Sequence, residues 1–162
     1  MRNNRAWFLD SGIQNRDNKL TPCWLLRCLA LAMLAALWCV PAAAQCTVYV
    51  PTHKSNSVAV IDTVLDRVAA VVPVQFQPFA VAITPNGAFA YVTNSGWPVG
   101  SNSVSVIDTT TNTVVATIPV GNFPVGATIT PTGASAYVAN LNSNNVSVID
   151  TATNTVVDTV RG

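Results

Sequence analysis

The 162-residue chain contains no glutamate, and only 9% of its residues are charged. Eight Lys and Arg residues stand against seven Asp, so the chain lacks the basic excess that nucleic-acid-binding proteins need. Half of the residues are hydrophobic, which excludes a disordered chain, because such chains are rich in charge and poor in apolar side chains. Without glutamate, no Glu side chain is available to partner an acid–base pair. The length allows one domain.

Helix-forming residues are also scarce over most of the chain. Residues 45–162 contain two Leu, no Met and one Lys, but 24 Val and 17 Thr. β-Branched side chains are stiff and pack well on a pleated sheet. Residues 45–162 therefore have an all-β composition.

Residues 1–44 have a different character and carry five basic residues against two acidic ones. After Arg27 come 13 uncharged residues, followed by Pro41-Ala-Ala-Ala44. A basic start, an apolar stretch of this length and a small-residue cleavage site are typical of a secretory signal peptide. A retained anchor is the alternative, but 13 residues rise only about 20 Å as a helix, against about 30 Å of hydrocarbon. We expect cleavage after Ala44, no membrane span afterwards, and a periplasmic, cell-surface or secreted protein.

The cysteines of the chain do not predict a disulfide bond in the mature protein. Three of the four cysteines leave with the predicted signal peptide, so Cys46 is the single thiol of the mature chain. It cannot form an internal disulfide, and the fold must be held by packing. Gln45 precedes it where a lipobox has a small residue, so we expect no lipid there.

Residues 45–162 contain three copies of one repeat. Tyr49-Val-Pro-Thr52, Tyr91-Val-Thr-Asn94 and Tyr137-Val-Ala-Asn140 are three versions of one strand end. A second strand ends in Val-Ile-Asp each time, at Asp62, Asp108 and Asp150. Alternation of Val with polar residues predicts that one face of each strand packs. The full set of predicted strands is 49–52, 57–63, 68–74, 80–84, 88–93, 103–109, 113–120, 126–130, 134–139, 145–151 and 155–160.

Turn residues set the phase of the repeat. Thr84-Pro-Asn-Gly87 and Thr130-Pro-Thr-Gly133 place Pro where a φ near −65° is needed and Gly where φ is positive. Asn112 and Asn154 end longer hairpin loops and tolerate the left-handed region, and Asp66 takes their place in the first copy.

Four-stranded antiparallel meanders that repeat every 40-odd residues are propeller blades. A parallel β-helix repeats at a shorter interval, and an immunoglobulin-like sandwich does not repeat its sequence. We therefore predict an all-β fold, a partial β-propeller of about 2.75 four-stranded blades. Partial blade 1 covers 47–78, blade 2 covers 79–122 and blade 3 covers 123–162.

The motif Tyr91-Val-Thr-Asn94, followed by Val-Ser-Val-Ile-Asp-Thr109 and Val-Val-Ala-Thr-Ile-Pro-Val-Gly121, resembles the YVTN family of β-propeller repeats. The resemblance extends over residues 47–162. Members of that family are exported or surface-layer proteins of bacteria and archaea. The resemblance implies a propeller, in many members seven-bladed, but no single activity, because the family is defined by its repeat.

The number of blades poses a physical problem, because closed propellers usually have 4 to 8 of them. Three units leave two outer faces uncovered. We expect further blades as partners, and favour a fragment of a longer propeller that lacks C-terminal sequence. Neighbouring copies that assemble into a ring are the alternative, and a nonfunctional gene fragment is a third interpretation.

No residue is assigned a catalytic, cofactor-binding or metal-binding role. His53 is the single histidine and has no other ligand at suitable spacing. Asp62, Asp108 and Asp150 are expected to accept N–H groups of the turns that they open, rather than to form a carboxylate ring. Trp97 in the long loop of blade 2 is a candidate for recognition, or for covering the blade edge.

The sequence thus predicts an exported non-catalytic module for cell-surface structure or for binding a protein or small molecule, without a cofactor. Some seven-bladed propellers similar to these repeats are lactonases, or dehydrogenase subunits that work with a metal or quinone. The resemblance therefore leaves open a propeller enzyme whose site lies in missing blades.

Overall fold

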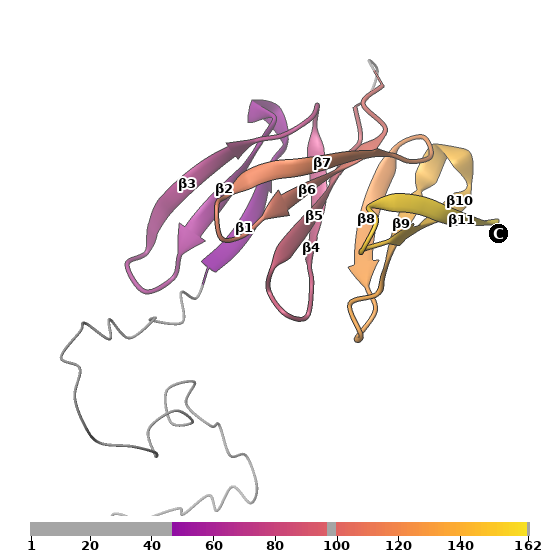
Figure 1. The fold of residues 1–162 in the computed structure, drawn as a ribbon. Helices are drawn as coiled ribbons and strands as arrows, with labels where there is room; N and C mark the ends of the chain where they lie inside the picture. The colour runs from indigo at the N-terminus through magenta and orange to yellow at the C-terminus, as the bar shows by residue number, and fades with distance from the viewer. Residues whose placement is uncertain (1–46, 97–99, 162) are drawn as a thin grey trace, which may run out of the picture. The chain divides into compact units, whose positions relative to one another are not determined.

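The computed structural model describes residues 47–96 and 100–161, which form three antiparallel sheets (Figure 1). Two 3-10 turns, η1 (His53–Ser55) and η2 (Leu141–Ser143), join strands within the first and third sheets. Among these described residues, no helix has the length and apolar character needed to cross a membrane. The strands are β1 (Thr47–Thr52), β2 (Ser57–Asp62), β3 (Arg67–Pro73), β4 (Pro78–Ile83), β5 (Phe89–Asn94), β6 (Ser103–Asp108), β7 (Thr113–Pro119), β8 (Pro124–Ile129), β9 (Ser135–Asn140), β10 (Asn145–Asp150) and β11 (Thr155–Arg161).

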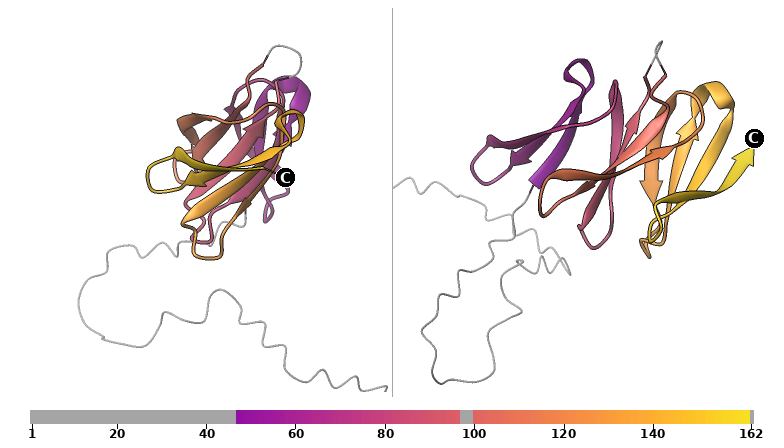
Figure 2. Two further views of the ribbon diagram at one scale, coloured as in Figure 1. Left: turned by 90° about the vertical axis from the view of Figure 1, so that its right-hand side faces the viewer. Right: turned by 45° about the horizontal axis from the view of Figure 1, so that its top comes forward.

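Each sheet is a meander in chain order, namely β1–β3, then β4–β7, then β8–β11. The sheets stand side by side in that order (Figure 2). One three-stranded and two four-stranded sheets confirm the predicted all-β fold and partial propeller. We refer to them below as blades 1, 2 and 3.

The first strands of blades 2 and 3 begin earlier than the sequence predicted. β4 starts at Pro78 and β8 at Pro124, two residues before the predicted starts at 80 and 126. Proline has no N–H to donate, and the first residue of a strand is one of the few places in a sheet that tolerate it. Each of these strands has a register irregularity just after the proline.

The turns follow the predicted chemistry. Gly87 and Gly133 have φ values of 72° and 77°. Asn112 and Asn154 both have a φ of 54°, and Asp66 has a φ of 47°. The left-handed positions that the repeat assigned to Gly, Asn and Asp are therefore confirmed.

The core lies between the sheets. In the first cluster, Tyr49, Val58, Val60 and Val72 of blade 1 pack against Ala90, Val92 and Ile107 of blade 2. The second cluster repeats this arrangement one blade further on, with Tyr91, Val104, Val106 and Ile118 against Ala136, Val138 and Ile149. A blade of this chain therefore has two apolar faces, and each face is buried only by a neighbouring blade.

The tyrosine that recurs in each repeat has a structural role in blades 1 and 2. Tyr49 Oη donates to Asn112 Oδ1 at 2.8 Å, and Tyr91 Oη donates to Asn154 Oδ1 at 2.7 Å. Both bonds join one blade to the hairpin loop of the next, 63 residues along the chain. Burial raises the pKa of both tyrosines, and the nearby Asp108 and Asp150 carboxylates raise it further. The neutral hydroxyl is therefore the form that holds the blades together.

The contribution of the Tyr91–Asn154 hydrogen bond to stability should be measurable in a double-mutant cycle of Tyr91→Phe with Asn154→Gly. Phenylalanine removes the donor, and glycine removes the acceptor but retains the positive φ. We expect a coupling energy of about 1 kcal/mol in urea unfolding, the usual net contribution of one hydrogen bond. Strictly additive effects would show that the bond does not stabilise the blade interface.

Candidate functional site

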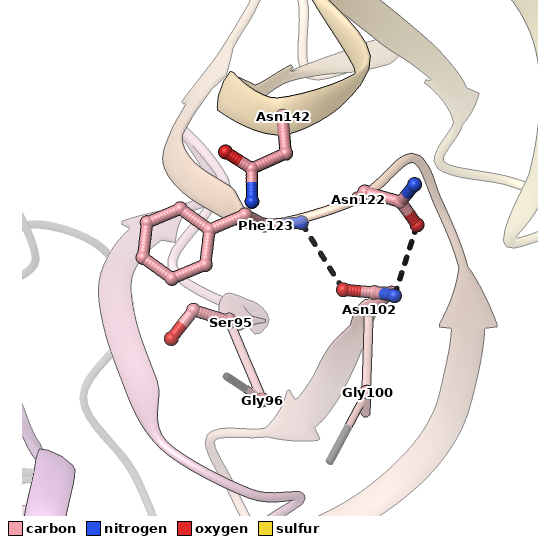
Figure 3. A pocket seen from close by; sticks show the side chains of 7 residues that line it. All are labelled: Ser95, Gly96, Gly100, Asn102, Asn122, Phe123 and Asn142. Carbon is pink, nitrogen blue, oxygen red and sulfur yellow. Dashed lines mark hydrogen bonds between the residues drawn. The ribbon is translucent and has the colours of Figure 1, made fainter. Parts of the chain in front are cut away.

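A pocket of about 230 Å³ lies at one end of blades 2 and 3, where their loops meet (Figure 3). Its lining comes from the β5–β6 connection, the β7–β8 connection and η2. None of the described residues that line the pocket is charged. The lining residues are Ser95, Gly96, Gly100, Asn102, Asn122, Phe123 and Asn142.

Asn102 organises this pocket. Its Oδ1 accepts the Phe123 N–H at 3.1 Å, and its Nδ2 donates to Asn122 Oδ1 at 3.1 Å. The first repeat has the same backbone link, since Asn56 Oδ1 accepts the Gln77 N–H at 3.0 Å. Both asparagines therefore hold the chain where it crosses from one blade to the next.

Sequence reasoning missed this asparagine, although a signal was present. Asn56, Asn102 and Asn144 each stand directly before a Val-Ile-Asp strand, and all three have positive φ. A recurring asparagine at a positive φ marks a backbone position that few other residues adopt. The hydrogen-bond partner of Asn102, the Phe123 N–H, lies 21 residues further along the chain, so the local sequence pattern could not predict it.

The chemistry available in the pocket is that of amides beside one aromatic ring. The Asn122 and Asn142 side chains are exposed and can donate or accept hydrogen bonds, while Phe123 supplies an apolar surface. An uncharged lining of this kind fits a small neutral polar ligand better than an ion. An ion that enters a pocket loses its hydration, and this cost is offset only by an opposite charge in the protein.

The three strand-end carboxylates hold turns, as the sequence predicted. Asp62 Oδ1 accepts the N–H groups of Val64 and Leu65 at 2.9 and 3.1 Å. Asp108 and Asp150 repeat this pattern, each accepting the N–H groups two and three residues on. Hydrogen bonds from Thr111 and Thr110 hold the pKa of Asp108 below its usual range, and bonds from Thr153 and Ala152 do the same for Asp150.

These lowered pKa values predict a loss of stability in acid. A carboxylate that ionises more readily in the folded state stabilises it above the unfolded pKa of about 3.9, and this stabilisation disappears as the pH falls through the folded pKa. We expect the urea midpoint to fall on acidification, and to fall less in a variant with both Asp108→Asn and Asp150→Asn. Equal acid sensitivity of the two proteins would contradict the assignment.

Of the remaining sequence candidates, the structure describes only His53. His53 is exposed in η1 and contacts Phe79 of blade 2 edge to face, with ring centroids 6.4 Å apart. In the described part of the chain, no three His, Cys, Asp or Glu side chains gather as metal ligands would. Trp97, Cys46 and the predicted signal peptide lie outside the described residues.

Two buried asparagines, Asn94 and Asn140, are the last residues of β5 in blade 2 and β9 in blade 3. Asn94 Nδ2 donates to Ser105 Oγ at 3.0 Å, and Asn140 Nδ2 donates to Ser147 Oγ at 2.9 Å. Their Oδ1 atoms are buried and have no hydrogen-bond partner among the described residues. Gly121 lies directly against Asn140, since a Cβ at Gly121 would be 2.7 Å from Asn140 Cγ.

A Gly121→Ala variant should therefore be destabilised. The added methyl group meets a buried amide that cannot withdraw, so we expect a loss of about 1–3 kcal/mol, as in other overpacked cores. Gly126→Ala is the matched control, because its new Cβ would approach nothing closer than 4.0 Å. Chemical denaturation of both variants tests this, and an equal effect in both would exclude the steric explanation.

Comparisons with known proteins agree with the fold. The family model described as "Lactonase, 7-bladed beta-propeller" matches residues 45–159. No match was found among curated proteins. Among solved structures, Kuenenia stuttgartiensis hydrazine synthase is 36% identical with a TM-score of 0.67, and the match covers 72% of this chain and 34% of that one. This chain thus spans about a third of the hydrazine synthase chain.

Two further structures resemble the chain in fold alone. The dihydro-heme d1 dehydrogenase NirN, solved in complex with DHE, is 18% identical with a TM-score of 0.60, over 70% of this chain and 24% of that one. U3-55K is 15% identical with a TM-score of 0.64, over 72% and 36%. Since the family model matches most of the chain, the protein belongs to the lactonase family of seven-bladed β-propellers.

Proposed function

We propose that this chain is an exported, non-catalytic segment of a YVTN-type propeller, which serves cell-surface structure or binds a protein or a small neutral molecule. The use of its carboxylates carries the proposal. Asp62, Asp108 and Asp150 each accept two backbone N–H groups of their own turns. The carboxylates that recur in every repeat therefore hold the turns, and this use supports a structural role for them.

The pocket at the loops of blades 2 and 3 supports a binding role. It is bounded by loops on a scaffold of sheets, which is where propellers and other rigid folds present recognition surfaces. Its amides offer hydrogen bonds without a charge, so its ligand would be neutral and polar. The apolar run before Pro41-Ala-Ala-Ala44 supports export.

A propeller enzyme is the second candidate, and the family match favours it. The matched family is described as lactonase, and one similar structure is a dehydrogenase. A lactonase-like or a quinone- or metal-dependent reaction would then require ligands from blades beyond those described here. The full propeller, rather than these three sheets, would carry such a site.

Two measurements on the protein purified from the cells that produce it distinguish the binding module from the enzyme. The proposal predicts a mature N-terminus at Gln45 in the exported fraction, by mass spectrometry, and no hydrolysis of γ- or δ-lactones above a heat-denatured control. Turnover that scales with protein concentration and is lost with a chelator would establish the enzyme instead. An uncleaved chain in the cytosol would overturn export.

A further inference from the structure

A single Asn-Gly pair occurs in the chain, and it lies in the turn that joins β4 to β5. Asn86 and Gly87 are both exposed. Gly87 has a φ of 72°, and no atom lies within 4 Å of the position that a Cβ would take there. The peptide nitrogen of Gly87 therefore has no side chain beside it to hinder the approach of another group.

The Asn86 side chain is held against the turn by two hydrogen bonds to the same oxygen. Its Oδ1 accepts the Ala88 N–H at 3.0 Å and the Thr84 hydroxyl at 2.7 Å. The bond from Ala88 spans Gly87, so it keeps the Asn86 amide along this backbone instead of extended into solvent. Thr84 is buried, and its Oγ1 accepts the Phe89 N–H at 3.0 Å, so its hydroxyl is itself fixed in place.

Two donors on one amide oxygen favour a particular reaction of this pair. When the Gly87 nitrogen attacks Asn86 Cγ, Oδ1 gains negative charge in the tetrahedral intermediate. Hydrogen-bond donors already aimed at such an oxygen stabilise that charge, as they do in the oxyanion hole of an enzyme. One bond opposes the attack, since the Gly87 N–H donates to Thr84 O at 2.7 Å and must first be released. Local opening of an exposed turn costs little free energy, because it uncovers few packed side chains.

We propose that Asn86 is a site of spontaneous deamidation, in which the Gly87 nitrogen closes a succinimide ring that water then opens. In the first step a solvent base removes the Gly87 N–H proton and the N–Cγ bond forms. The Cγ–Nδ2 bond then breaks, and the departing nitrogen takes a proton and leaves as ammonia. In the second step water breaks one of the two imide C–N bonds. Overall, one water is consumed and one ammonia is released, with no oxidation or reduction.

The two products differ in what they leave of the turn. Cleavage of the imide bond at Cγ gives aspartate, which keeps an oxygen for Thr84 and Ala88, as Asp108 does for the N–H two residues on. Cleavage at the backbone carbonyl carbon gives isoaspartate, in which the chain runs through the side chain and the turn gains one backbone atom. The spacing that brings the Gly87 N–H to Thr84 O is then lost.

The shape of this turn affects the packing of two blades. A Cβ at Gly133 would be only 3.3 Å from Pro85 Cδ, so the equivalent turns of blades 2 and 3 lie close together. A cavity of about 480 Å³ beside them is lined by uncharged described residues, among them Asn86, Thr132 and Thr151. Isoaspartate therefore disturbs the contact between the turns, and either product adds a negative charge to a neutral cavity.

Ageing of the purified chain tests the site. The protein is incubated at several mildly alkaline pH values, and peptides that contain residues 84–89 are analysed by mass spectrometry with fragmentation that distinguishes isoaspartate from aspartate. We expect Asn86 to convert before any other asparagine of residues 45–162, and both products to form. The rate should rise roughly tenfold per pH unit, because the deprotonated fraction of a peptide nitrogen does so far below its pKa.

The chain supplies a matched control for the reaction. Asn86→Thr gives blade 2 the turn chemistry of blade 3, where Thr132 accepts the Ala134 N–H at 3.4 Å and Gly133 has a φ of 77°. This variant should show no conversion at the turn and should keep its urea midpoint on ageing, whereas the unmodified chain loses stability as isoaspartate accumulates. Asn86→Asp imitates the other product and should retain the midpoint at neutral pH, because a carboxylate accepts the same two bonds.

Two variants of Thr84 test whether the turn contributes beyond the Asn-Gly pair itself. Thr84→Ser keeps the hydroxyl and should convert at the rate of the unmodified chain. Thr84→Val removes it and should slow conversion on the order of tenfold, less than in a buried oxyanion hole because this turn is exposed. Circular dichroism verifies that both variants fold. Equal or faster conversion of the valine variant would contradict the role assigned to the hydroxyl.

Two further results would overturn the proposal. Asn142 is exposed and is followed by Ser143, and its conversion ahead of Asn86 would show that exposure alone selects the site. An Asn86 that stays intact in the folded chain but converts in urea would show that the bond from Gly87 to Thr84 protects it. None of these measurements depends on ligand binding, export or lactone turnover, which test the proposed function.

Discussion

The requirement that a blade be buried on both faces governs this structure. Each sheet is thin and apolar on both sides, so its hydrophobic residues leave water only when another sheet lies against them. The two core clusters are therefore both interfaces between blades, and no blade has a core of its own. The Tyr–Asn bonds across each interface add direction to a contact that hydrophobic burial leaves non-directional. The order of the blades and the stability of the described sheets both follow from this single requirement.

In the described blades, the recurring polar side chains hold turns and the crossings between blades. A chain with 9% charged residues uses its strand-end aspartates to hold turns, and Asn56 and Asn102 to hold the crossings between blades. Their recurrence in sequence reflects the repeated backbone, not a repeated ligand set. The pocket between blades 2 and 3 differs because its lining comes from connections, whose side chains are only partly engaged in holding the sheets. The side chains that line this pocket are therefore carried by the connections, while the strands supply the scaffold.

Much of the fold could be predicted from the sequence, because a repeat displays each local rule several times. The strands ending at Asp62, Asp108 and Asp150, and the left-handed positions at Gly87 and Gly133, depend on residues within a few positions. The early start at Pro78 was missed, since strand pairing there continues past a register irregularity that alternation does not reveal. The Tyr–Asn bonds and the pocket were missed for another reason. They join residues 63 and 21 positions apart, and only the stacking of blades brings these together.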